Sequence, residues 1–257
     1  NHHGNGFDIG EFAKDLKGNL LPWFLEMFRY AGQSQVARKV VGNLLGPGGP
    51  FQDTDFFRSR LGGDFFLALT DVDSHEALAC LQRTVGSWIH DELLEFRDGR
   101  RGVIWALERM AMWKDTFSGA AKLLLKLAEA ENETWSNNAT GVFAELFSPG
   151  CGKVAPTEAS PQERLPVLEE ALLSGSEKKR SIALKACDAA LEAQHFSRMV
   201  GAEHQGFRPK PKLWTPRTYG EIWDAYRQVW LLLRRQLPAL VAEQRRQAVQ
   251  ILLNNGG

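Results

Sequence analysis

The sequence of 257 residues contains little cysteine, no excess of charge of either sign and no long apolar run. Its three cysteines, Cys80, Cys151 and Cys187, include no CxxC pair, which argues against a disulfide framework or a structural zinc site. Basic and acidic residues number 31 each, so bulk attraction to nucleic acid or to a membrane surface is disfavoured. No apolar run approaches the roughly 20 residues of a membrane span. We therefore expect a cytoplasmic protein that binds no membrane, with Cys80 and Cys187 as buried thiols.

The motifs of common catalytic sites are also missing. The glycine-rich stretch at residues 42–49 does not end in Gly-Lys-Ser or Gly-Lys-Thr, so it does not form a P-loop. His75 and Glu76 are not followed by a second histidine one helical turn later, and Ser87 lacks the second glycine of a nucleophile elbow. The acidic residues between positions 53 and 76 do not have the spacing of a calcium loop. These absences predict no catalytic residue, no bound metal and no cofactor.

Apolar residues recur at intervals of three and four along nearly the whole chain, which is the period of amphipathic helices. A helix is expected over residues 54–69, and three pairs of helices are expected to begin near residues 74, 116 and 160. The second helix of the middle pair is expected over residues 136–147. The third begins with the capping box Ser160-Pro161-Gln162-Glu163, and Leu168 lies on its apolar face. A spacing of roughly 40 to 45 residues is typical of HEAT and armadillo repeats. The pattern predicts an all-α fold of stacked antiparallel helix pairs, a HEAT/armadillo-like α-solenoid.

The chain is expected to divide into three parts. Residues 1–50 form an N-terminal segment with helices over 12–30 and 33–45, and its start, Asn1-His2-His3-Gly4, is typical of an affinity-tag remnant. The run from Gly46 to Pro50 breaks the helical pattern. Residues 51–200 form the helix-pair region. Residues 201–257 form a proline-rich linker and a C-terminal helix pair over 218–236 and 238–253.

A basic cluster beside a tryptophan is one candidate interaction site. Arg97, Arg100 and Arg101 precede Trp105, and arginine with tryptophan is common at protein interfaces. If these arginines bind a partner, alanine at Arg100 and Arg101 should leave the melting temperature nearly unchanged. The alternative is a basic loop whose arginines satisfy carbonyl groups at helix ends.

Two further segments are candidates. The polar turn over residues 131–138 contains Trp135, Asn137 and Asn138, and the alternative is a capped turn that holds its own backbone. Lys212 and Trp214 lie in an extended basic segment with three prolines. The alternative for that segment is a linker pinned to the helices by Trp214.

Several stretches resemble the helical region of large bacterial STAND-type NTPases, some of which are antiphage defence proteins. The resemblance lies in Trp105-Ala106-Leu107-Glu108, in residues 128–141, in Leu213-Trp214-Thr215-Pro216 and in residues 219–223. It implies a solenoid that senses a trigger, next to a nucleotide-binding module. The Walker residues of that family have no counterpart here, so any ATPase activity belongs to another part of the protein. We therefore expect a non-catalytic scaffold or sensor that recognises a protein partner.

The alternative is an enzyme on the same architecture. Some DNA glycosylases are built of HEAT-like repeats and use a face with tryptophans, an acid and basic residues. The zero net charge counts against this alternative, because neutralisation of phosphates supplies much of the affinity for DNA. A nucleic-acid partner is therefore not expected.

Overall fold

The computed structural model describes residues 34–150, 154–192 and 208–255, with residues 23, 27, 30, 31, 196, 198 and 203–206. The start of the chain, most of the expected helix over 12–30, and Cys151 lie outside the described residues. Within them the regular structure consists of helices α3 to α14 and two short 3-10 turns, with no strand. The predicted all-α fold class is confirmed.

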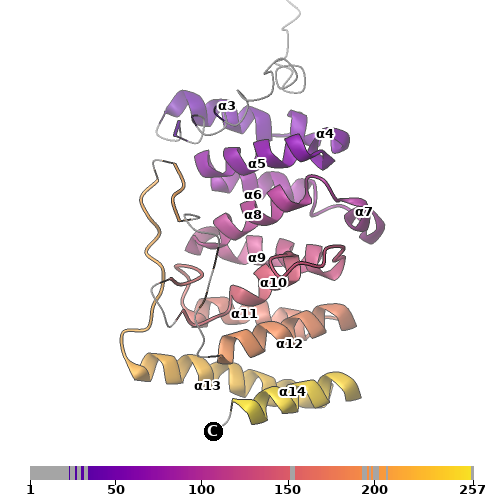
Figure 1. Ribbon diagram of the computed structural model, residues 1–257, viewed down its shortest axis with the longest axis vertical. Coiled ribbons are helices and arrows are strands. Elements are labelled where there is room, and N and C mark those ends of the chain that lie inside the picture. Colours follow the sequence, from indigo (N-terminus) through magenta and orange to yellow (C-terminus); the bar gives the residue numbers. More distant parts are fainter. Residues whose placement is uncertain are drawn as a thin grey trace, which may run out of the picture.

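The helices form a stack of two layers (Figure 1). The first layer contains α5 (Arg60–Val72), α8 (Arg100–Ala111), α10 (Ala139–Glu145), α12 (Glu177–Leu191) and α14 (Ala242–Asn254). The second layer contains α3 (Gln35–Leu45), α6 (Ser74–Arg83), α9 (Lys114–Glu129), α11 (Pro161–Leu172) and α13 (Tyr219–Gln236). Each helix contacts the next one of its own layer and a partner in the other. The pairs expected near 74, 116 and 160 are α6/α8, α9/α10 and α11/α12.

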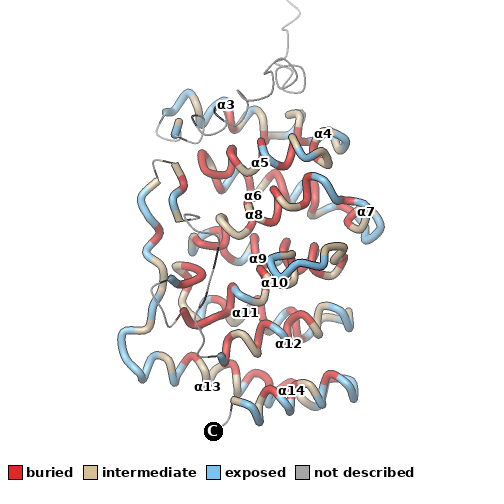
Figure 2. The backbone as a smooth tube through the Cα atoms, viewed as in Figure 1, coloured by how far each residue is buried: buried red, intermediate tan, exposed pale blue. Residues whose placement is uncertain are grey.

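The predicted caps set where these helices begin. The Asp73 carboxylate accepts hydrogen bonds from the first turn of α6. Ser160 and Glu163 form the expected capping box at α11. Buried residues occur in every helix of both layers (Figure 2), and most of the apolar ones belong to one cluster, in which Leu168 is fully buried. The apolar faces inferred from the sequence therefore build one continuous core.

The region around residues 46–99 differs from the expected pattern in its details. The single helix expected over 54–69 is two helices, α4 (Thr54–Arg58) and α5, because Ser59 has extended backbone and caps α5 through Gly62 N–H. A short helix not predicted, α7 (His90–Glu95), precedes α8. The break after Leu45 is a loop across which the core continues, since Leu45 and Phe51 belong to the same cluster of buried residues.

Close packing of α5 on α8 depends on small residues. A Cβ atom added at Gly102 would lie 2.5 Å from the backbone of Gly63, and one at Gly63 would lie 2.6 Å from the carbonyl oxygen of Gly99. Both distances are shorter than any van der Waals contact allows. The two backbones therefore approach as closely as they do only because these positions have no side chain.

An extended strap, which we define as residues 203–206 and 208–218, runs along one edge of the stack (Figure 1). The Trp214 N–H donates to the Thr157 carbonyl at 2.8 Å. The Arg208 guanidinium donates to Ser74 Oγ at 2.9 Å and lies 3.9 Å from the centre of the Trp113 ring. Lys212 is exposed, and its backbone N–H donates to the Glu158 carboxylate. For Lys212 and Trp214 the structure therefore shows the alternative, a linker pinned to the helices.

The two described thiols should be chemically inert in the folded protein. Cys80 and Cys187 are fully buried, as expected, and burial raises the pKa of Cys80 to about 11 and the pKa of Cys187 above its ordinary value. The reactive thiolate is therefore scarce at neutral pH and also inaccessible. In a Cys151→Ser variant, a thiol-labelling reagent at pH 8 should modify neither cysteine within the time that modifies both in urea. Mass spectrometry measures this, and rapid native labelling at Cys80 would contradict it.

Candidate recognition surface

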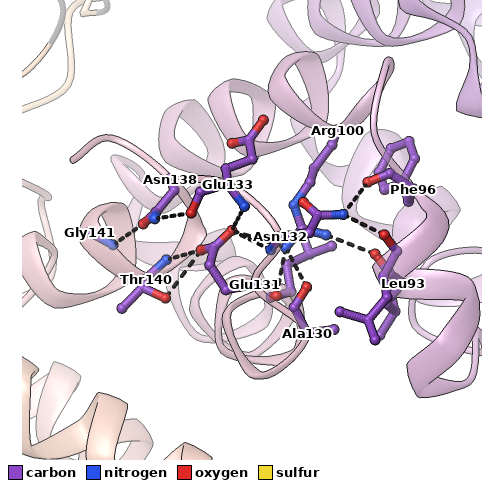
Figure 3. A network of polar contacts seen from close by, with 12 residues as sticks. Leu93, Phe96, Arg100, Ala130, Glu131, Asn132, Glu133, Asn138, Thr140 and Gly141 are labelled. Atoms are coloured by element: carbon purple, nitrogen blue, oxygen red, sulfur yellow. Dashed lines mark hydrogen bonds and ion pairs between the residues drawn. The ribbon is translucent and has the colours of Figure 1, made fainter. Parts of the chain in front are cut away.

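Arg100 is a buried structural residue at the base of the candidate surface (Figure 3). Its guanidinium donates to the carbonyl of Leu93 at 3.0 Å and to those of Leu127 and Ala130 at 2.7 and 3.1 Å. It also pairs with the Glu131 carboxylate at 3.4 Å. The expectation that Arg100 belongs to an exposed interaction site is therefore corrected. Its fully buried side chain satisfies the carbonyl groups at the end of α9.

Glu131 extends this network into the polar turn of residues 131–138 (Figure 3). One carboxylate oxygen pairs with Arg100, and the other accepts hydrogen bonds from the N–H and the hydroxyl of Thr140, at 2.9 and 3.1 Å. The Asn132 side-chain amide donates to the carbonyls of Leu94 and Phe96. The polar turn is thus tied both to the start of α10 and to the segment after α7.

The junction between the polar turn and α10 is tightly packed. Asn138 caps α10, because its side-chain oxygen accepts from the Gly141 N–H at 2.9 Å while its amide donates to the Glu133 carbonyl at 3.0 Å. A Cβ atom at Gly141 would lie 1.7 Å from the Ser136 carbonyl oxygen, so only glycine fits. For Asn138 the structure shows the alternative, a capped turn. These bonds hold the turn in place, and within it the Trp135 carbonyl accepts a hydrogen bond from the Asn138 N–H at 3.3 Å.

Three of the predicted residues meet at the surface and form what we call the tryptophan ridge: Trp105, Arg101 and Trp135. The Arg101 guanidinium carbon lies 4.6 Å from the centre of the Trp135 ring and 5.6 Å from that of Trp105. Trp135 is 51% exposed although its backbone belongs to a fixed network. Asn137 is exposed beside it, and Arg97 is exposed in the loop before α8.

Two clefts border the ridge, one on each side of α10. The acidic cleft, about 550 Å³ between α8 and α10, is lined by Trp105, Glu108, Ser136, Asn137, Gly141, Val142, Glu145 and Arg198. The basic cleft, about 440 Å³ between α10 and α12, is lined by Glu131, Thr134, Trp135, Ser136, Asn138, Thr140, Gly141, Ala144, Lys178, Ser181, Ile182 and Lys185. Ser136 and Gly141 line both clefts, so the polar turn and the start of α10 separate them.

The acidic cleft holds two carboxylates, of which that of Glu108 is partly buried and that of Glu145 is exposed. Burial raises the pKa of Glu108, an effect that Arg198 and Arg109 partly offset. Burial and the nearby Glu192 both raise the pKa of Glu145. The Arg198 guanidinium donates to the Ala155 carbonyl, which holds it at the edge of the cleft. The carboxylates of Glu108 and Glu145 make no hydrogen bond or ion pair within the described part of the chain.

Glu108, Glu145 and Lys185 were not identified from the sequence as candidate site residues. For Glu108 alone, the sequence does contain a pattern that could have indicated it. Arg101, Trp105 and Glu108 are spaced by four and three residues, which places them on one face of a helix. Glu145 and Lys185 come near that face only because α10 packs beside α8, and α12 packs beside α10. No local pattern contains that information.

A groove in the second layer is less suited to binding, because its charges already have partners. It has a volume of about 590 Å³ and lies between α9, α11 and α12. Lys122 pairs with Glu170 at 2.6 Å, and Lys179 pairs with Glu129 at 3.1 Å. The acidic and basic clefts are therefore the better candidates for recognition.

Searches for other sites and for relatives add no assignment. Among the described residues no helix is long and apolar enough to cross a membrane, and no three histidine, cysteine or acidic side chains are grouped to hold a metal ion. Comparisons with protein-family models, curated proteins and solved structures found no match.

Proposed function

We propose that the chain is a non-catalytic helical scaffold that recognises a protein partner through the tryptophan ridge. The observation that carries this proposal is the half-exposed Trp135, whose ring lies against the Arg101 guanidinium, in a turn that Glu131 and Asn138 tie to α8 and α10. Tryptophan and arginine dominate the energetics of protein interfaces. A side chain that is already held in place loses little conformational entropy on binding, so its contacts contribute more to affinity.

The resemblance of the sequence to helical regions of STAND-type NTPases supports a sensor role within a larger bacterial protein. In that role a trigger protein would bind one arrangement of the stack better than another. Differential affinity of this kind shifts the population of arrangements and so biases an attached domain. The proposal assigns nucleotide hydrolysis to such a domain and recognition to this chain.

A second candidate function, DNA-base chemistry on a HEAT-like scaffold, has one observation in its favour. The acidic cleft combines Trp105, a carboxyl group with raised pKa at Glu108, and Arg198. Binding of a fluorescent duplex, measured by anisotropy at low and high salt, separates the two candidates. Strong binding at low salt that is lost at high salt supports the enzyme candidate, since phosphate contacts are salt-sensitive.

Replacing Trp135 with alanine should abolish partner capture without unfolding the protein. The side chain is half exposed, so its removal should change the free energy of unfolding by less than about 1 kcal/mol. Loss of a tryptophan hot spot should weaken binding by at least about 30-fold. The measurement is affinity capture from source cells, followed by a dissociation constant with the purified partner.

The matched control for this experiment is Trp223→Ala. Trp223 is a tryptophan of similar exposure, 60%, on α13 at the far end of the stack. The control should capture the partner as the unaltered protein does. If both variants lose capture to the same extent, or if both capture the partner as the unaltered protein does, recognition through the ridge is refuted.

A further inference from the structure

The two clefts beside the tryptophan ridge carry available charge of opposite sign. We propose that the ridge binds a peptide segment of the partner that places a basic side chain in the acidic cleft and an acidic side chain in the basic cleft. This inference rests on the proposed function and adds the chemistry of the partner to it. The segment would cross the polar turn, which is the wall shared by the two clefts.

The acidic cleft suits a lysine or arginine side chain. Glu108 on α8 and Glu145 on α10 line it from two neighbouring helices, and among the described residues of its lining Arg198 is the one cation. Glu145 also has the like charge of Glu192 nearby. A bound cation would relieve the repulsion at Glu145 and offset the partial burial of the Glu108 carboxylate. The Trp105 ring in the same wall offers a face for a cationic group.

The basic cleft suits a carboxylate. Lys178 and Lys185 lie seven residues apart on α12, which places them on the same face of the helix, and both are exposed. The acidic residue in the lining, Glu131, already pairs with Arg100 and Thr140. Neither lysine has an ion pair with a described residue, so their charge remains for a ligand.

The mixture of charges selects a peptide over a nucleic acid. A polyphosphate backbone long enough to cross the polar turn would bring phosphates close to Glu108 and Glu145, and like charges in a partly buried cleft repel strongly. A peptide segment, in contrast, carries both signs of charge within a few residues. Its apolar or aromatic residues can contact the exposed Trp135 between the two charged groups.

The experiment selects binders for the whole chain from a displayed library of random twelve-residue peptides. The probes are then the enriched peptides themselves, made synthetically and titrated by calorimetry. The variants are an acidic-cleft pair, Glu108→Gln with Glu145→Gln, and a basic-cleft pair, Lys178→Gln with Lys185→Gln. Lys122→Gln with Glu170→Gln in the other groove is the matched control, and Trp135→Ala tests the ridge.

Enriched peptides should contain both a basic and an acidic residue. Each cleft pair should weaken their binding by about tenfold or more, the effect of losing a favourable charge contact. A selection against the acidic-cleft pair should no longer enrich a basic residue but should still enrich an acidic one. A selection against the basic-cleft pair should show the reverse. The control pair should change nothing, and melting temperatures should remain within a few degrees.

Failure of this inference is distinguishable from failure of the proposed function. Peptides whose binding needs Trp135 but is unchanged by both cleft-pair variants would overturn the proposed pairing of charges. The ridge would then remain as the recognition site. Peptides that bind equally well to Trp135→Ala, or a selection that enriches none, would overturn both. Enriched sequences that match segments of this chain would point to a second copy as the occupant and overturn the partner proposed here.

Discussion

Alanine at Arg100 should lower the free energy of unfolding by about 3–5 kcal/mol, which is the usual effect of removing one partner from a buried network of charged groups. The substitution leaves the carbonyls of Leu93, Leu127 and Ala130 without their donor and the carboxylate of Glu131 without its cation. Buried groups that lose a hydrogen bond bear the full cost of desolvation. Urea unfolding followed by circular dichroism measures the loss.

Arg101→Ala is the matched control, one residue along the same helix. Its guanidinium contacts the rings of Trp105 and Trp135, and a partly exposed contact of this kind contributes less than about 1 kcal/mol. Arg100→Ala should therefore shift the transition strongly and Arg101→Ala hardly at all. This reverses the expectation that both arginines are dispensable for stability. Equal losses in the two variants would mean that the carbonyl network contributes little.

The helix pairs could be predicted from the sequence because apolar periodicity and caps are local. The faces carrying Leu168 and Cys187, and the caps at Asp73 and Ser160, each depend on residues within a turn or two. Stacking then follows, since an amphipathic helix must cover its apolar face. The same reasoning failed for the break at Ser59, where a side-chain cap in the middle of an apolar pattern interrupts the helix.

The candidate surface could be predicted only in part, because its geometry depends on distant residues. Arg100 and Arg101 are alike in sequence, and only the position of the α9 end, 27 to 30 residues away, makes one of them buried. The helix expected from 136 to 147 is shorter and begins at Ala139, since Glu131 and Asn138 hold the preceding turn.

Arg164 was not singled out from the sequence, yet its loss should be as damaging as that of Arg100. It is 1% exposed, and it donates to the carbonyls of Ala159, Leu146 and Ser148 at 2.7, 3.2 and 2.7 Å. Burial lowers its pKa to about 9, which still leaves it charged at neutral pH. It therefore joins the end of α10 to the start of α11, as Arg100 joins the end of α9 to α8.

Methionine at Arg164 should reduce the free energy of unfolding by about 3–5 kcal/mol, because it fills much of the space and supplies no donor. The guanidinium also lies 5.7 Å from the centre of the Trp214 ring, so the strap should loosen at that point and the fluorescence of Trp214 should shift to longer wavelength. Arg235→Met is the control, an exposed arginine paired with Glu169 whose loss should cost less than about 1 kcal/mol. A loss at Arg164 no greater than that at Arg235 would show that the three carbonyls are satisfied without it.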